Sequence, residues 1–201
     1  MTLFKSSYLT LFLCLATLMC SMTVSYLVTG NVFGKVRIID LEAYGGVTIE
    51  HLRNGEYWRL LMSQLVHSKP IHMLYNLLSL LLLGGVLERR VGSFRFLFVW
   101  FVGGAIGTVV STFTVPAPWN LGTGGSQAVL SVAGLGVMLY ALRVDRSRFL
   151  LGVLLFALAP ALILDVLHSP SHLPKAGHVV SLMAGLLLGG LLLKFRRHRL
   201  V

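Results

Sequence analysis

The amino-acid sequence predicts an all-α membrane protein, a bundle of six transmembrane helices with a long first loop. Composition supports this fold class, since 56% of the 201 residues are hydrophobic, 12% are charged and the mean hydropathy is +0.82. A soluble domain averages roughly 45–50% apolar and about 25% charged residues. The apolar residues form continuous runs of helical length, and none of these runs alternates as the strands of a membrane barrel do.

The apolar runs approach the roughly 20 residues that a helix needs to cross a bilayer. They comprise residues 8–27, 71–87, 94–114, 126–142, 149–167 and 178–193. The first run follows Lys5, as a secretory signal would, but it is longer than a signal core and no small-x-small cleavage site follows it. We therefore interpret it as a span. The length leaves room for one domain, and we expect a single membrane domain over residues 1–201.

The basic residues of the short connections predict the orientation, because Lys and Arg concentrate on the cytoplasmic side of a membrane. Two loops and the tail on one predicted side are basic: Arg89, Arg90 and Arg95; Arg143, Arg146 and Arg148; and Lys194, Arg196, Arg197 and Arg199. On the opposite side, residues 115–125 hold no basic residue and residues 168–177 hold only Lys175. We expect a multi-pass protein of a bacterial inner membrane with both termini in the cytoplasm. Much of the net charge of +10 then reflects topology and attraction to anionic membrane lipids, and no nucleic-acid partner is expected.

The connection over residues 29–70 is unusually long for a helical bundle, and long loops are often functional. It mixes charged residues with aromatic ones such as Tyr44, Tyr57 and Trp58. Trp and Tyr anchor at the level of the lipid headgroups. This composition predicts an amphipathic segment that lies in the membrane interface.

Four polar residues stand at the starts of predicted spans, where polar groups are costly and indicate a functional site. His72 and Asn76 open the second run and, being four residues apart, share one helical face. Ser126 opens the fourth run and His178 opens the sixth. Even-numbered spans begin on the outer side in this topology. The four side chains should therefore lie at a similar depth near one membrane surface.

These residue types predict nucleophilic catalysis. A serine hydroxyl becomes an effective nucleophile when a neighbouring base takes its proton, and a neutral imidazole is the usual base. We predict Ser126 as the nucleophile and His178 as the base. The backbone at Gly125 and Ser126, where a tight turn meets a helix N-terminus, and the side chains of His72 and Asn76 are the candidates to stabilise the oxyanion.

Each candidate also has a structural interpretation. Ser126 is alternatively a helix N-cap, His178 an interfacial histidine bonded to a carbonyl, and Asn76 a polar contact between helices. All four polar residues are expected at one depth. This coincidence favours the catalytic interpretation over three unrelated structural roles.

The remaining titratable residues predict no metal and no cofactor. His51 and His67 in the long loop have no partner spacing that indicates zinc. Asp165 is the only acid in the later spans and is a candidate to orient His178 as the acid of a triad. Pairing of Asp165 with His168 or Lys175 is the simpler interpretation.

Five short motifs follow one another along the chain: Glu56-Tyr57-Trp58-Arg59, His72 with Asn76, Glu88-Arg89 with Gly92-Ser93, Gly124-Gly125-Ser126, and Ala176-Gly177-His178. In their order and their positions on the spans, they resemble the rhomboid family of intramembrane serine proteases. The resemblance covers nearly the whole chain. It implies a six-helix core, a Ser–His dyad without a third acid, a water-accessible cavity below the outer surface, and substrates that are themselves transmembrane helices entering from the lipid.

The chain departs from the family pattern at three positions. Gln127 follows the nucleophile where a glycine is usual, Ser181 stands where a glycine commonly follows the base, and Leu130 replaces an aromatic residue one turn after the serine. Gln127 either narrows the cleft or donates a hydrogen bond to the oxyanion. The alternative function is therefore a catalytically inactive rhomboid-like protein that binds transmembrane helices.

Two faces of small residues predict close helix packing, and a proline predicts a kink. One face consists of Gly103, Gly107 and Ser111 on the third run, and the other of Ser181, Gly185 and Gly189 on the sixth run. The proline is Pro160 in the fifth run.

Overall fold

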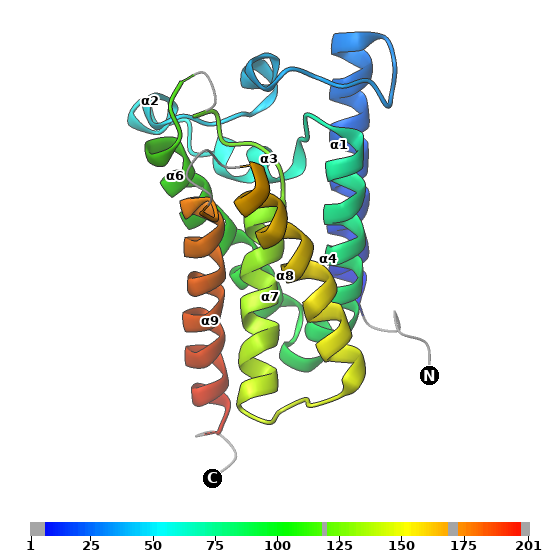
Figure 1. The fold of residues 1–201 in the computed structure, drawn as a ribbon, viewed down its shortest axis with the longest axis vertical. Coiled ribbons are helices and arrows are strands. Elements are labelled where there is room, and N and C mark those ends of the chain that lie inside the picture. The colour runs from blue at the N-terminus through cyan, green and yellow to red at the C-terminus, as the bar shows by residue number, and fades with distance from the viewer. Residues whose placement is uncertain (1–6, 118–119, 169–172, 198–201) are drawn as a thin grey trace.

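The computed structural model describes residues 7–117, 120–168 and 173–197, and these residues form a bundle of helices (Figure 1). Five helices are long and apolar enough to cross a membrane: Tyr8–Thr29, Pro70–Val91, Ser93–Thr114, Arg148–Leu167 and Ala176–Lys194. The ends of each lie within about four residues of the predicted run. The fourth run, residues 126–142, forms a shorter helix of 16 residues, α7 (Ser126–Ala141). The predicted all-α membrane fold is confirmed.

The chain passes up and down the bundle. In Figure 1, α1 (Tyr8–Thr29) begins and α9 (Ala176–Arg197) ends at the same end of the bundle. Residues 30–69, which we call the cap, lie at the opposite end, the cap end. The cap contains a 3-10 helix (Ile38–Tyr44), α2 (Ile49–Arg53) and α3 (Arg59–Leu65). The long loop is thus a set of short helices, and its place in the membrane interface stays a prediction.

Arg59 holds the turns of the cap together. Its Nε donates to Glu56 Oε2 at 2.6 Å, and one terminal nitrogen donates to the carbonyl oxygens of Glu42 at 2.5 Å and Gly46 at 2.9 Å. Its guanidinium also lies over the ring of Trp58, 4.7 Å from the centroid. The Glu-Tyr-Trp-Arg motif therefore fixes the shape of the cap.

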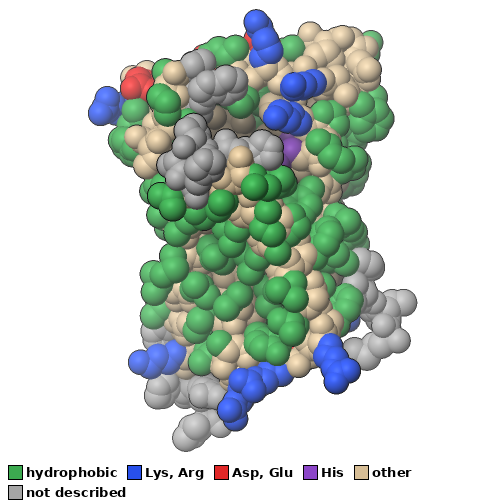
Figure 2. All heavy atoms as spheres, viewed as in Figure 1, with side chains coloured by type: hydrophobic (Ala, Val, Ile, Leu, Met, Phe, Trp, Pro, Cys, Tyr) green, Lys and Arg blue, Asp and Glu red, His purple; other side chains and the backbone are tan. Residues whose placement is uncertain are grey.

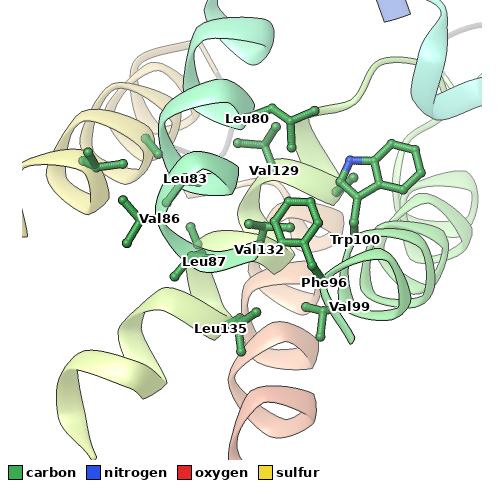
Figure 3. Close-up of a cluster of buried hydrophobic side chains, with 14 of the residues drawn as sticks. Leu80, Leu83, Val86, Leu87, Phe96, Val99, Trp100, Val129, Val132 and Leu135 are labelled. Carbon is green, nitrogen blue, oxygen red and sulfur yellow. The ribbon is translucent and has the colours of Figure 1, made fainter. Parts of the chain in front are cut away.

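The helix at the centre of the bundle is α7, in which every residue from Ser126 to Gly136 is buried. Its sequence is apolar on almost all sides, as expected for a helix surrounded by others. Val129 and Val132 pack against Phe96 and Trp100 in the hydrophobic core (Figure 3). This core gives α7 a fixed position.

The third membrane helix changes its winding midway. It consists of α5 (Ser93–Phe98), a π-helical turn (Val99–Gly103) and α6 (Gly104–Thr114). A π turn widens the helix and disturbs its regular hydrogen bonds. Ser131 of α7 donates its hydroxyl to the Val99 carbonyl oxygen at 2.9 Å. Hydropathy predicted an uninterrupted helix here because it carries no signal for a partner on another helix.

The predicted small-residue faces lie where α6, α7 and α9 meet. Gly107 of α6 faces Ser181 of α9, and Gly185 of α9 faces the backbone of Ser131 on α7. A methyl group on either glycine would overlap its neighbour. The prediction of close packing is confirmed, and it brings the first turns of α7 and α9 together.

The helix α8 (Arg148–His168) is joined to α4 (Pro70–Val91) through Tyr75. Pro160 has no N–H, so the carbonyl of Phe156, four residues earlier, loses its helical donor. The Tyr75 hydroxyl lies 3.1 Å from this oxygen and 2.8 Å from the carbonyl oxygen of Ala157. The helix continues through Pro160, and the single hydroxyl proton of Tyr75 is shared between these two carbonyl oxygens.

Glu88 joins the end of α4 to the start of α1. Its carboxylate is 1% exposed and accepts hydrogen bonds from the N–H groups of Leu9 (3.1 Å) and Thr10 (2.8 Å) and from the hydroxyls of Thr10 (2.6 Å) and Ser93 (2.7 Å). The first N–H groups of a helix have no partner within it, and a negative charge at that end is favourable. Glu88 therefore caps α1 across the bundle.

Replacing Glu88 by alanine should lower the free energy of unfolding by on the order of 3 kcal/mol, because buried donors lose their acceptor. Glu88→Gln keeps one carbonyl acceptor and should cost less. Thermal unfolding of the purified variants in detergent micelles measures both effects. Equal melting temperatures for the wild type and Glu88→Ala would contradict this role.

Candidate active site

The structure brings Ser126 and His178 together, as the sequence predicts. Ser126 is the first residue of α7, and His178 lies in the first turn of α9. Their side chains meet with Ser126 Oγ 2.9 Å from His178 Nε2. The two residues are 8% and 6% exposed. A hydroxyl at this distance from an imidazole nitrogen has the geometry that proton transfer requires.

The glycine-rich loop before α7 is fixed on both sides. Gly122 pairs with Val47 of the cap through two backbone hydrogen bonds of 2.8 and 3.1 Å. Gly124 donates its N–H to the Ser63 carbonyl oxygen at 2.7 Å and has φ of +93°. A residue with a Cβ is strained in that conformation. The loop therefore delivers Ser126 to α7 in one backbone arrangement.

The site lies inside the bundle. The 16 residues of α7 extend about 24 Å, whereas the 22 residues of α4 extend about 33 Å. Because α7 starts beneath the cap (Figure 1), its first residue is set below the cap end. His72 on α4, beside the glycine-rich loop, is exposed at the surface of the bundle.

The two α4 residues of the predicted oxyanion set lie beside the glycine loop. A methyl group built on Gly124 would lie 3.6 Å from His72 Nε2, which places the imidazole next to the loop. Asn76 is buried, and its Nδ2 lies 3.2 Å from Nε2 of His67. The N–H of Gly125 is donated to the same His67 nitrogen at 3.0 Å. In this conformation, Asn76 and Gly125 are thus directed at His67.

His67 is a site residue that sequence reasoning missed. Its Nε2 accepts from Gly125, so its proton lies on Nδ1, which is 3.1 Å from the oxygen of Ser21. Ser21 in turn donates to the Leu65 carbonyl oxygen at 2.8 Å. Burial lowers the pKa of His67 to about 3, so the ring is neutral at physiological pH. This histidine anchors the loop from 58 positions away, a distance at which spacing gives no signal.

Asp165 of α8 contacts the far side of the candidate base. Its Oδ2 lies 2.5 Å from His178 Nδ1. The same oxygen accepts from the Lys175 N–H at 3.2 Å, and Oδ1 lies 3.6 Å from Lys175 Nζ. The predicted pairing with Lys175 is present together with the less favoured contact to His178. The side chain of His168, the other predicted partner, lies outside the described residues.

Comparison with known proteins decides the family. The family model of the Rhomboid domain matches residues 54–195, which include α3 to α8, all but the last two residues of α9, and every predicted site residue. The chain belongs to the rhomboid family.

Relatives of this rhomboid protein include proteases and an inactive member. Rhomboid protease GlpG of Haemophilus influenzae is 30% identical over 149 residues, 74% of this chain and 76% of GlpG. Rhomboid protease GluP of Bacillus subtilis is 29% identical over 153 residues, which cover 76% of this chain but only 29% of GluP. Inactive RHOMBOID-like protein 8 of Arabidopsis thaliana is 32% identical over 103 residues, 51% of this chain and 28% of that protein. Membership alone therefore leaves activity open.

Gln127, the departure beside the serine, is buried and turned toward α6 in this rhomboid protein. Its Oε1 lies 3.1 Å from Ser126 Oγ, and its Nε2 is 3.4 Å from Ser111 Oγ. The single hydroxyl proton of Ser126 points either to Gln127 or to His178. In this rotamer the amide N–H of Gln127 faces Ser111 and is directed away from Ser126.

The part of the chain that the structure describes contains no group of three or more His, Cys, Asp or Glu residues arranged to hold a metal ion.

Proposed function

We propose that this rhomboid protein is an intramembrane serine endopeptidase that hydrolyses peptide bonds of transmembrane protein substrates. The observation that carries the proposal is the 2.9 Å contact between Ser126 Oγ and His178 Nε2 in a buried site. Two of the relatives, GlpG and GluP, are named as rhomboid proteases, which supports the same reaction class.

The reaction divides into acylation and deacylation. Ser126 Oγ attacks the scissile carbonyl carbon while its proton passes to His178 Nε2. The imidazolium then protonates the leaving amine as the C–N bond breaks, which leaves an ester on Ser126. A water molecule gives its proton to His178 and attacks the ester, and the serine recovers its proton when the acid leaves. The histidine thus acts as base and acid in turn.

The negative charge of each tetrahedral intermediate needs donors. The Ser126 N–H opens α7, where backbone donors have no helical partner and the helix dipole favours an anion. We assign the second hydrogen-bond donor to the His72 imidazole and the third to the Asn76 amide. The Asn76 amide would have to turn from His67 toward the oxyanion. Gly125 instead acts by shaping the turn, because His67 already accepts its N–H.

The distribution of hydrophobic and basic side chains over the surface suits a protein that meets its substrate within the membrane. Figure 2 shows a broad hydrophobic band across the visible face, with Lys and Arg side chains gathered at its two ends. We propose that this band contacts the lipid tails of a bacterial inner membrane and that the termini face the cytoplasm. A transmembrane helix would then reach Ser126 from the lipid near the opposite surface.

A second function is favoured by Gln127. Its Oε1, 3.1 Å from Ser126 Oγ, competes with His178 for the hydroxyl proton, and RHOMBOID-like protein 8 is an inactive relative. The chain would then bind transmembrane helices without cutting them.

Labelling with a fluorophosphonate probe separates the two functions. The purified wild type should become labelled and should cut a transmembrane reporter in proteoliposomes, because Ser126 is an activated nucleophile. Ser126→Ala should lose both properties, since it lacks the reacting oxygen. Ser131→Ala removes a buried hydroxyl of the same helix outside the site and should keep the labelling. An unlabelled, inactive wild type would favour the helix-binding function.

A further inference from the structure

We propose that Asp165 is a positioning residue that completes a Ser–His–Asp triad by holding His178 with Nε2 directed at Ser126. The inference rests on the proposed function, since it names how the base of that site is oriented. The family resemblance implied a dyad without a third acid, so this assignment concerns the particular chain.

The two ring nitrogens of His178 face different partners. Nδ1 lies 2.5 Å from Asp165 Oδ2, and Nε2 lies 2.9 Å from Ser126 Oγ. An ionised carboxylate has no proton to donate, so Nδ1 must carry the hydrogen of the neutral ring. Nε2 is then the unprotonated nitrogen. The carboxylate therefore selects the tautomer that can accept the serine proton.

The surroundings of Asp165 suit a negative charge. The residue is 5% exposed, and a buried charge is tolerated when it is paired and hydrogen-bonded. Lys175 supplies its backbone N–H at 3.2 Å and its ammonium at 3.6 Å, and the start of α9 lies at the same place. The carboxylate can thus stay ionised beside an imidazole that becomes positive.

The charge of Asp165 matters most while His178 is protonated. When the Ser126 proton moves to Nε2, the ring becomes an imidazolium between the attacked carbonyl and the carboxylate. Asp165 stabilises this cation and keeps its own charge, and the proton moves on to the leaving nitrogen. The carboxylate is neither consumed nor protonated during the cycle.

Leu130, another position near the dyad at which the sequence departs from the family pattern, cannot orient the imidazole of His178. Leu130, one turn after Ser126 on α7, is buried and apolar and has no group to bond the imidazole. In the described part of the chain, the hydrogen-bond partner of His178 Nδ1 is Asp165. The carboxylate contacts the base from α8, a third helix.

The competing interpretation is structural. Asp165 also bonds the backbone of Lys175 just before α9, so it joins α8 to α9 whether or not it acts on the base. Asp165→Asn separates the two roles. The amide keeps the shape and a carbonyl acceptor, but it lacks the charge and no longer selects one tautomer of His178.

The test compares four proteins in proteoliposomes: the wild type, Asp165→Asn, Asp165→Glu and Asp145→Asn. Asp145 is the matched control, since it is a buried carboxylate in the connection between α7 and α8, paired with Arg90 at 2.8 Å. Asp165→Asn should lower kcat by about 10²-fold or more with little change in KM, by analogy with the loss when the acid of a serine-protease triad becomes an amide. Asp165→Glu should restore part of the loss, and Asp145→Asn should leave kcat unchanged.

The tautomer gives a readout that does not depend on activity. With ¹⁵N-labelled histidine, and with His178→Ala to assign the signals, the wild type should show His178 protonated on Nδ1. Asp165→Asn should show a mixture of tautomers. A kcat for Asp165→Asn within threefold of the wild type, or an unchanged nitrogen spectrum for His178, would overturn the proposal.

Failure of the proposed protease function gives a different result from failure of the triad proposal. In that case the wild type itself neither cuts the reporter nor reacts with the fluorophosphonate. The nitrogen spectra of the wild type and Asp165→Asn then decide alone whether the carboxylate orients His178.

Discussion

Replacing His178 by alanine should reduce the kcat for cleavage of a transmembrane reporter by about 10⁴-fold or more, because the serine loses the base that takes its proton. Among the residues that the structure describes, His178 is the histidine whose ring lies at hydrogen-bond distance from Ser126 Oγ, at 2.9 Å. Initial rates of reporter cleavage in proteoliposomes measure the loss.

The matched control is His51→Ala. His51 lies in the cap, where its ring contacts Thr48 and lies 3.3 Å from Glu42, away from Ser126. This variant should retain wild-type kcat. If His178→Ala kept more than about a tenth of the wild-type kcat, another group would be the base and the assigned mechanism would be wrong.

The serine and the histidine could be predicted because each begins a helix on one side of the bundle. Hydropathy fixes where a span starts, and the alternation of spans fixes the side on which it starts. The depth and the side of each residue therefore follow from the sequence without knowledge of its neighbours in space. Ser126 and His178 lie at the start of α7 and in the first turn of α9, and the close approach of those helices follows from small residues that are visible in the sequence.

The contacts of His67 and Asp165 could not be decided in the same way, although Asp165 was one of the candidate partners of His178. Hydropathy gives the depth of a residue but not which helix lies beside it. Asp165 reaches His178 only because α8 stands next to the first turn of α9. His67 reaches Gly125 only because the cap folds back over the glycine loop. Both contacts arise from lateral packing, which a single sequence does not encode in a local pattern.

The orientation of Gln127 is a further case. Its side chain was expected either to narrow the cleft or to serve the oxyanion, and both ideas depend on a rotamer. In the structure the rotamer follows from α6, where Ser111 accepts from the amide at 3.4 Å. The neighbour that decides the matter stands 16 positions earlier, on another helix.

Replacing Gly185 by alanine should be among the most destabilising single changes in the chain. A Cβ at this position would lie 2.6 Å from the carbonyl carbon and 2.8 Å from the Cα of Ser131. These are backbone atoms of the central helix and cannot rotate away, so α7 and α9 must separate. Overpacking of this kind costs about 3 kcal/mol. Because His178 lies about 10 Å further along α9, separation should also lengthen its contact with Ser126 and lower kcat.

The control is Gly152→Ala on α8, where a methyl group would meet no atom within 4 Å. Alanine is a better helix former than glycine by about 1 kcal/mol, so this variant should melt at or slightly above the wild-type temperature. Thermal unfolding and reporter cleavage, measured on the same preparations, test both changes. Gly185→Ala must lose stability and activity together if contact between α7 and α9 aligns the serine with the histidine. A variant that melts like Gly152→Ala and cuts at the wild-type rate would show that this contact is not what aligns them.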